Sequence, residues 1–146
     1  DKKYKYVGAS WLTKENTVLE TDNVLAYLDE VYKAENIPSR CQLLIFGFSQ
    51  GVSIAARWVA KRQLKCDQLV LYAGEVPSEL SANEFKFLGQ NQTKVKVIVG
   101  NQDEYLTEQR LEEISKNIQV VFEGRADQLV FEGGHEVRKQ IINELI

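Results

Sequence analysis

The sequence contains no methionine, two cysteines and one histidine, and their scarcity excludes several classes of protein. Cys41 and Cys66 are too few for a disulfide framework, and we expect both to be half-buried free thiols. Neither belongs to a C-x-x-C pair, and His135 supplies a single imidazole, so an ordinary zinc site lacks ligands. Without a methionine, either the initiator was removed or the biological N-terminus precedes Asp1.

Charge and hydropathy exclude further classes. The 18 Lys and Arg residues are outnumbered by 21 Asp and Glu residues, and this net charge of −3 argues against a nucleic-acid binder with a broad basic surface. No apolar run approaches the roughly 18 residues that span a bilayer, and no secretory signal is visible at the N-terminus. We therefore expect a cytoplasmic protein without a membrane span, and we leave a homodimer open.

Helices and buried strands alternate along the chain. Short apolar runs predict the strands, and apolar residues at helical spacing predict the helices. Because a helix follows each buried strand, the pattern implies βαβ crossovers and a mostly parallel sheet with helices on both faces. The 146 residues suit a single α/β domain over 1–146. The strands are expected at 42–46, 68–73, 94–99 and 128–131, the helices at 22–35, 50–63, 106–122 and 137–145, and a loop with one short helix at 74–93.

The first predicted strand runs into Gly47-Phe48-Ser49-Gln50-Gly51, which has the pattern G-x-S-x-G. In such a turn the chain passes abruptly from a strand to a helix, and the serine takes a strained backbone conformation. Glycines at positions 47 and 51 are expected to avoid collisions there. The turn exposes the Ser49 hydroxyl at the start of the next helix. The backbone N–H of Gln50 can then stabilise an oxyanion, with the helix dipole adding to it.

A serine hydroxyl is a weak nucleophile that needs a base, and His135 is the one histidine that could serve. It follows the fourth predicted strand through Gly133-Gly134, a pair that lets the loop turn back toward Ser49. A carboxylate must then orient the imidazole. Asp103, after the third strand, is the preferred residue, and Glu104 is the reserve. The chain order Ser–Asp–His is that of α/β-hydrolases and differs from the chymotrypsin and subtilisin orders.

These motifs resemble the phospholipase/carboxylesterase group of α/β-hydrolases, which includes the acyl-protein thioesterases. The resemblance rests on Gly47-Phe48-Ser49-Gln50-Gly51, on Asp103 in its post-strand loop, and on Gly133-Gly134-His135. Tyr72-Ala73-Gly74-Glu75-Val76-Pro77 also resembles the group's Gly/Pro segment, and Trp11 resembles an aromatic residue before the corresponding helix. The resemblance covers essentially the whole chain and implies an α/β-hydrolase fold.

The sequence departs from that group at three places. Val52 stands where the group often has a second glycine, and Glu104-Tyr105 follows Asp103 where the group usually has a Val-Pro type pair. Members also begin with strands and a glycine-rich loop that carries the second oxyanion donor, and nothing in residues 1–20 resembles that loop. We therefore expect the N-terminal strands to be missing from this chain. The loss of one oxyanion donor typically lowers the rate about 10²–10³-fold.

The sequence thus predicts a serine hydrolase that cleaves small carboxylic esters or thioesters through an acyl-enzyme. Ser49 is the expected nucleophile, His135 the base and Asp103 its orienting carboxylate, and this mechanism requires no metal or organic cofactor. Trp11 and Phe48 are candidates for the substrate pocket. One alternative is a lysophospholipase or an acyltransferase with the same triad. Another is a non-catalytic α/β-hydrolase-like binding module, which has no need for all three residues in order.

Overall fold

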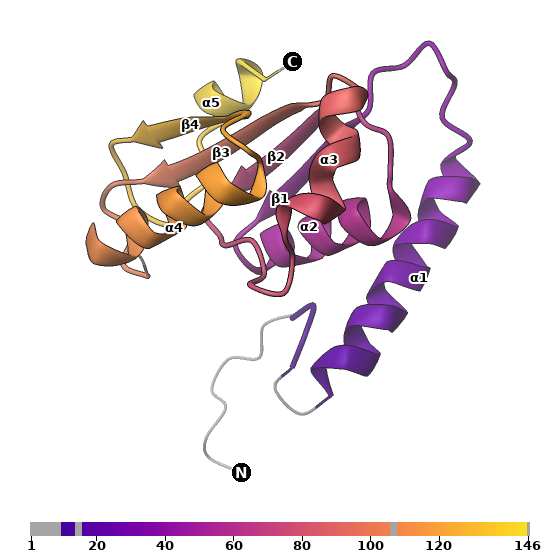
Figure 1. Ribbon diagram of the computed structural model, residues 1–146, viewed down its shortest axis with the longest axis horizontal. Coiled ribbons are helices and arrows are strands. Elements are labelled where there is room, and N and C mark those ends of the chain that lie inside the picture. The colour runs from indigo at the N-terminus through magenta and orange to yellow at the C-terminus, as the bar shows by residue number, and fades with distance from the viewer. Residues whose placement is uncertain (1–9, 14–15, 106–107, 146) are drawn as a thin grey trace.

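The computed structural model describes residues 10–13, 16–105 and 108–145 (Figure 1). Helices and strands alternate along this part of the chain. The elements are α1 (Thr17–Glu35), β1 (Leu44–Phe48), α2 (Gln50–Arg62), β2 (Gln68–Tyr72), α3 (Ala82–Gln90), β3 (Lys94–Gly100), α4 (Glu108–Val121), β4 (Ala126–Phe131) and α5 (Lys139–Asn143). The four strands form one sheet in the order β1-β2-β3-β4, and every neighbouring pair is parallel. This arrangement confirms the predicted parallel α/β fold.

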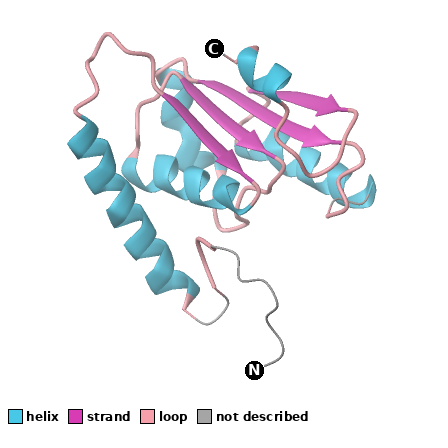
Figure 2. Cartoon of the chain, turned by 180° about the vertical axis from the view of Figure 1, so that it is seen from behind, coloured by secondary structure: helices cyan, strands magenta, loops and turns pink. Residues whose placement is uncertain are grey.

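Both faces of the sheet are covered by helices. In β2, Leu69 and Leu71 belong to a core shared with α2, α3 and α4, whereas Val70 and Tyr72 pack with α5 and the C-terminal residues. All four of these side chains are fully buried, which explains why β2 is a continuous apolar run rather than an alternating one. The coverage is unequal: of the helices in the described part of the chain, α2, α3 and α4 lie on one face and α5 alone lies on the other (Figures 1 and 2).

The long helix α1 packs beside α2 rather than directly on the sheet (Figure 2). Its Tyr32 ring meets the Trp58 ring edge-on at 5.9 Å. Asp29 accepts hydrogen bonds from the Trp58 indole at 2.9 Å and from Arg62 at 2.8 Å. Burial acts to raise the pKa of Asp29, but these two hydrogen bonds and the charge of Arg62 outweigh it and lower the pKa. No helix in the described ranges is long and apolar enough to cross a membrane.

Most element boundaries differ from the prediction by one or two residues, and the start of α1 differs by five. Helix α1 begins at Thr17 rather than at residue 22. Its first turn is held by the Thr21 hydroxyl, which donates to the Thr17 carbonyl at 2.6 Å, so apolar spacing gives no sign of it. Strand β1 continues to Phe48 because its pairing with β2 extends that far. Helix α5 is shorter than predicted, and the predicted start of α4 at residue 106 lies outside the described residues.

The two cysteines have different environments, so the prediction of two half-buried thiols is wrong. Cys41 is exposed in the loop before β1, whereas Cys66 is buried in the core. Burial, together with the nearby charge of Asp67, raises the pKa of the Cys66 thiol to about 11. Cys66 is therefore a neutral thiol at ordinary pH.

Candidate active site

Ser49 occupies the single position between β1 and α2. Its backbone has φ 55° and ψ −123°, a region that costs a non-glycine residue about 1–3 kcal/mol. Two hydrogen bonds hold the residue there: its N–H donates to the Tyr72 carbonyl at 2.9 Å, and its carbonyl accepts from the Val52 N–H at 3.0 Å. The strained turn that the G-x-S-x-G pattern predicts is therefore present, fixed between β2 and α2.

The two motif glycines have unequal steric roles. A Cβ atom at Gly47 would lie 2.5 Å from the backbone carbonyl oxygen of Gly51, so no side chain fits at position 47. A Cβ atom at Gly51 would meet only Trp11 Nε1 at 3.9 Å, so the collision expected there does not occur. Gly74 has a role that the sequence did not reveal, because a Cβ atom there would collide with the Ser49 carbonyl.

The loops after β3 and β4 are joined by backbone hydrogen bonds. Asn101 N–H donates to the Phe131 carbonyl at 2.9 Å, and Gln102 N–H donates to the Gly133 carbonyl at 2.8 Å. The Asn101 side-chain oxygen accepts from the Gly133 N–H at 3.2 Å. A Cβ atom at Gly100 would collide with the Gly133 carbonyl, so the close approach of the loops requires a glycine there. These bonds bring Asp103 and His135 to one edge of the sheet.

Ser49, His135 and Asp103 form a continuous chain of hydrogen bonds. The Nε2 atom of His135 lies 2.9 Å from the Ser49 Oγ atom, and its Nδ1 atom lies 2.7 Å from Asp103 Oδ2. The Asp103 side chain is fully buried, and its Oδ1 atom accepts from the Tyr105 N–H at 2.9 Å. Because a carboxylate only accepts, we infer that Nδ1 carries the proton and that Nε2 accepts from the Ser49 hydroxyl. The reserve residue Glu104 is exposed.

Two aromatic rings flank the imidazole of His135. The Phe48 ring lies 4.9 Å from it at an interplanar angle of 37°, and the Tyr105 ring lies 4.9 Å from it at 74°. Together with the bond to Asp103, these contacts restrict the ring's orientation. Sequence reasoning did not assign Tyr105 a role. Its position two residues after the candidate carboxylate was the only available signal.

A pocket of about 560 Å³ opens over the Ser49 hydroxyl, and we call it the Ser49 pocket. Ser49, Gln50, Tyr105, Arg110 and His135 are among the residues that line it. The N–H of Gln50 is the first of α2, where backbone donors lack partners within the helix and the helix dipole favours negative charge. The backbone N–H of Gln50 can therefore donate a hydrogen bond to an oxyanion that forms beside Ser49, which is the role that the sequence predicts for it.

The Gln50 side chain anchors the segment that precedes α1. Its Oε1 atom accepts from the Trp11 N–H at 2.8 Å and from the Ser10 hydroxyl at 3.1 Å, and its Nε2 atom donates to the Leu12 carbonyl at 3.1 Å. Residues 10–12 thus lie directly beside the turn that holds Ser49. Sequence motifs give no sign of this contact, because the partners are about forty positions apart.

Trp11 and Phe48, the predicted pocket residues, line a different cavity. They contribute to an apolar groove of about 430 Å³ between α1, β1 and α2, together with Leu28 and Trp58. Within the described residues, neither Ser49 nor His135 lines this groove. Phe48 still contacts the imidazole through its ring, but the substrate-binding role of both residues stays a prediction. No cluster of three or more potential metal ligands occurs in the described ranges.

Comparison with known proteins identifies the family. A family model described as "Serine hydrolase (FSH1)" matches residues 3–141. The chain belongs to this serine hydrolase family. A comparison with curated protein sequences finds no significant match.

Solved structures share the fold of this family member. They include an acyl-protein thioesterase 2 from Zea mays (14% identity, TM-score 0.66, 94% of this chain and 67% of that chain). A phospholipase/carboxylesterase from Dyadobacter fermentans has 23% identity and a TM-score of 0.63 over 96% of this chain and 68% of that chain. A Bacillus cereus carboxylesterase has 18% identity and a TM-score of 0.58 over 94% of this chain and 62% of that chain. These similarities confirm the α/β-hydrolase fold, although the chain spans only about two thirds of their length.

Proposed function

We propose that this chain is the catalytic part of a serine hydrolase that cleaves carboxylic esters or thioesters through an acyl-enzyme. The observation that carries the proposal is the hydrogen-bond chain from Ser49 Oγ through His135 to Asp103, with separations of 2.9 Å and 2.7 Å. The strained backbone of Ser49 and membership of the serine hydrolase family support it further. A purely structural role explains neither the strain nor the buried carboxylate behind the histidine.

The proposed reaction begins when Ser49 Oγ attacks the acyl carbon while His135 Nε2 accepts its proton. Negative charge develops on the carbonyl oxygen beside the Gln50 N–H, where the start of α2 stabilises it. His135 then donates the proton to the oxygen or sulfur of the leaving group, and the acyl-enzyme forms. Water, deprotonated by His135, attacks the acyl carbon and releases the acid, and the proton returns to Ser49. Asp103 keeps the imidazole oriented and stabilises its positive charge.

The neighbouring structures favour ester and thioester bonds over other bonds that serine hydrolases cleave. The Zea mays protein is described as an acyl-protein thioesterase, and the Dyadobacter fermentans protein as a phospholipase/carboxylesterase. In either bond, His135 would supply the proton that the leaving oxygen or sulfur needs. A lysophospholipase or an acyltransferase would use the same residues, and a panel of acyl donors and acceptors would separate these activities.

The decisive experiment labels the complete gene product with a fluorophosphonate and measures its intact mass. We expect one adduct on the wild type, none on Ser49→Ala, and one on Ser39→Ala, a control in the exposed loop before β1. Circular dichroism should show that all three proteins are folded. A folded wild type without an adduct would overturn the proposal and favour the non-catalytic binding module.

A further inference from the structure

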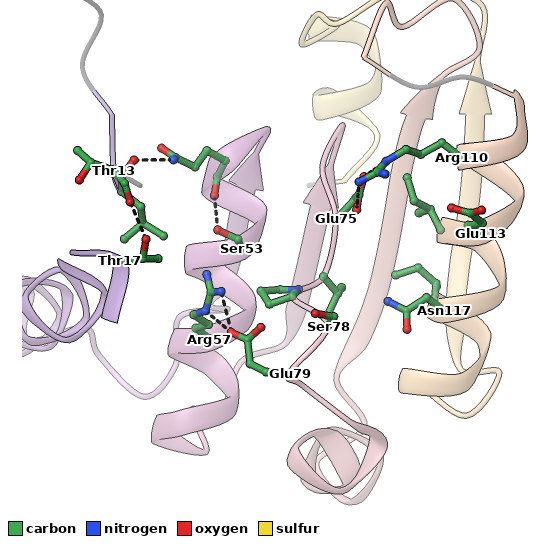
Figure 3. Close-up of a pocket in the computed structure, with 16 residues that line it drawn as sticks. Thr13, Thr17, Ser53, Arg57, Glu75, Ser78, Glu79, Arg110, Glu113 and Asn117 are labelled. Atoms are coloured by element: carbon green, nitrogen blue, oxygen red, sulfur yellow. Dashed lines mark hydrogen bonds and ion pairs between the residues drawn. The ribbon is translucent and has the colours of Figure 1, made fainter. Parts of the chain in front are cut away.

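A larger cavity lies between α2 and α4 (Figure 3). It has a volume of about 650 Å³, and the loop between β2 and α3 lies between its walls. Apolar side chains of Leu12, Val76, Pro77, Ile114 and Ile118 form part of its lining, and charged, hydroxyl and amide side chains form the rest. We call it the polar cleft after the second group. Gln50, Ser53, Glu75 and Arg110 line both the polar cleft and the Ser49 pocket, so the two cavities are continuous.

The geometry points to the polar cleft as the binding site for the acyl chain of the substrate, and to an acyl chain that carries neutral polar groups such as hydroxyls or amides. This inference rests on the proposed function, because it assumes that an acyl group is attached to Ser49. It adds a substrate class, which the family and the neighbouring structures do not give.

The position of His135 indicates which half of the substrate enters the polar cleft. The general acid must reach the oxygen or sulfur of the leaving group, so that group has to lie beside His135. His135 lines the Ser49 pocket, but it is not among the described residues that line the polar cleft. The polar cleft therefore joins the Ser49 pocket at Gln50 and Arg110, which line both cavities, and not at His135. This position suits the acyl side of the scissile bond.

The walls of the cleft contain two ion pairs that disfavour an alkyl chain. Arg57 on α2 meets Glu79 at 2.7 Å, and Arg110 on α4 meets Glu75 through two contacts of 2.7 Å and 3.0 Å (Figure 3). Each pair joins the β2–α3 loop to a neighbouring helix. An alkyl chain laid along these groups would remove water from them without replacing its hydrogen bonds, which is costly.

The charges of the cleft also disfavour an acyl chain that ends in a carboxylate. Each of the two arginines already faces a glutamate, and Glu113 adds a further carboxylate to the lining. An anionic acyl group would therefore enter a lining with more negative than positive charges. Neutral groups avoid this repulsion, and they can hydrogen-bond with Ser78 of the loop and Asn117 of α4, which are both exposed in the cleft (Figure 3).

Three thioesters of matched length test the inference with the complete gene product. The substrates are the heptanoyl, 6-hydroxyhexanoyl and 5-carboxypentanoyl thioesters of N-acetylcysteamine, and release of the thiol reports hydrolysis. We expect kcat/KM for the hydroxylated thioester to exceed that for the heptanoyl thioester by about tenfold, the effect of one or two hydrogen bonds. The carboxylated thioester should be the poorest of the three.

Paired variants locate the preference in the polar cleft. The double variant Ser78→Ala/Asn117→Leu removes two exposed polar groups of the lining, so we expect the tenfold ratio of kcat/KM values to fall to near one. Gln119→Leu makes a comparable change at an exposed position of α4 that lines neither cavity, and it should keep the ratio.

The possible results separate this inference from the proposed function. Equal or better hydrolysis of the heptanoyl or the carboxylated thioester would overturn the inference and leave the hydrolase intact. An unchanged ratio in the double variant would also overturn it. If none of the thioesters is hydrolysed although Ser49 accepts the fluorophosphonate, the acyl subsite is wrong but the nucleophile stands. If neither reaction occurs in a folded protein, both proposals fail.

Discussion

His135 Nε2 lies 2.9 Å from Ser49 Oγ, although the two residues are 86 positions apart in the sequence. The contact depends on the parallel sheet, which places the loops after β1 and β4 at the same edge. It also depends on the close approach of the loops after β3 and β4, because that approach sets Asp103 behind the imidazole. The hydrogen bonds between the two loops therefore determine the geometry of the site together with the three side chains.

Asp103→Asn should lower kcat about 10⁴-fold with little change in fold, because an amide can favour the wrong tautomer of His135. The matched control is Glu104→Gln, which removes a carboxylate at the neighbouring exposed position. It should keep nearly the wild-type rate. Both variants are measured with an activated ester and with fluorophosphonate labelling. Equal losses in the two variants would show that Asp103 has no special role.

Gly47→Ala and Gly51→Ala should have opposite consequences, although both change a glycine of the same motif. A Cβ atom at position 47 would lie 2.5 Å from the Gly51 carbonyl, and overpacking of this kind costs about 1–3 kcal/mol or more. Position 51 lies within α2, where alanine favours the helix by about 0.5–1 kcal/mol and meets only Trp11 at an ordinary distance. Urea denaturation should show Gly47→Ala destabilised and Gly51→Ala unchanged or stabilised. A large loss for Gly51→Ala would contradict this account.

The alternation of strands and helices was predictable because each buried strand is a short apolar run. The boundaries of the elements were less predictable. The end of β1 is set by the pairing of Phe48 with Tyr72, and the first turn of α1 is held by the Thr21 hydroxyl. Neither interaction leaves a hydrophobic period in the sequence. The burial of Cys66 and the exposure of Cys41 likewise depend on tertiary packing that spacing does not encode.

The hydrogen-bonded residues of the site were predictable because their chemistry leaves few choices. The sequence has one histidine, His135, and one G-x-S-x-G turn, which contains Ser49. Asp103 was the preferred carboxylate because it follows a strand, and the structure brings the three side chains together. Tyr105 and Arg110 were missed, because a ring beside the imidazole and an ion pair across a cleft depend on three-dimensional placement. The same reason explains why the groove that contains Trp11 and Phe48 could not be told apart from the Ser49 pocket.

The two thiols should differ sharply in reactivity. Cys41 is exposed, whereas Cys66 is buried and its pKa is raised to about 11, so it carries almost no thiolate at pH 8. We expect dithionitrobenzoate to modify one thiol rapidly in the folded protein and the second only after unfolding. Cys41→Ser should abolish the rapid phase. A rapid phase that survives in Cys41→Ser would show that Cys66 is accessible.

Asp29→Ala should weaken the packing of α1 on α2. It leaves the Trp58 indole N–H without its acceptor and removes the partner of Arg62, which we expect to lower the free energy of unfolding by about 1–3 kcal/mol. Asp22→Ala is the matched control on α1, since its contact with Lys61 is 3.5 Å long and exposed, and it should cost less than about 0.5 kcal/mol.

The effect of Asp29 should also depend on pH, with a sign fixed by its lowered pKa. A carboxylate whose pKa is lower in the folded state stabilises the fold fully above the pKa of the unfolded chain. The stabilisation then disappears as the pH falls through the folded value. Urea denaturation followed by circular dichroism should therefore show the difference between wild type and Asp29→Ala shrinking as the solution is acidified. A difference that stays constant from neutral to strongly acidic pH would mean that the hydrogen bonds of the ionised carboxylate do not hold α1 against α2.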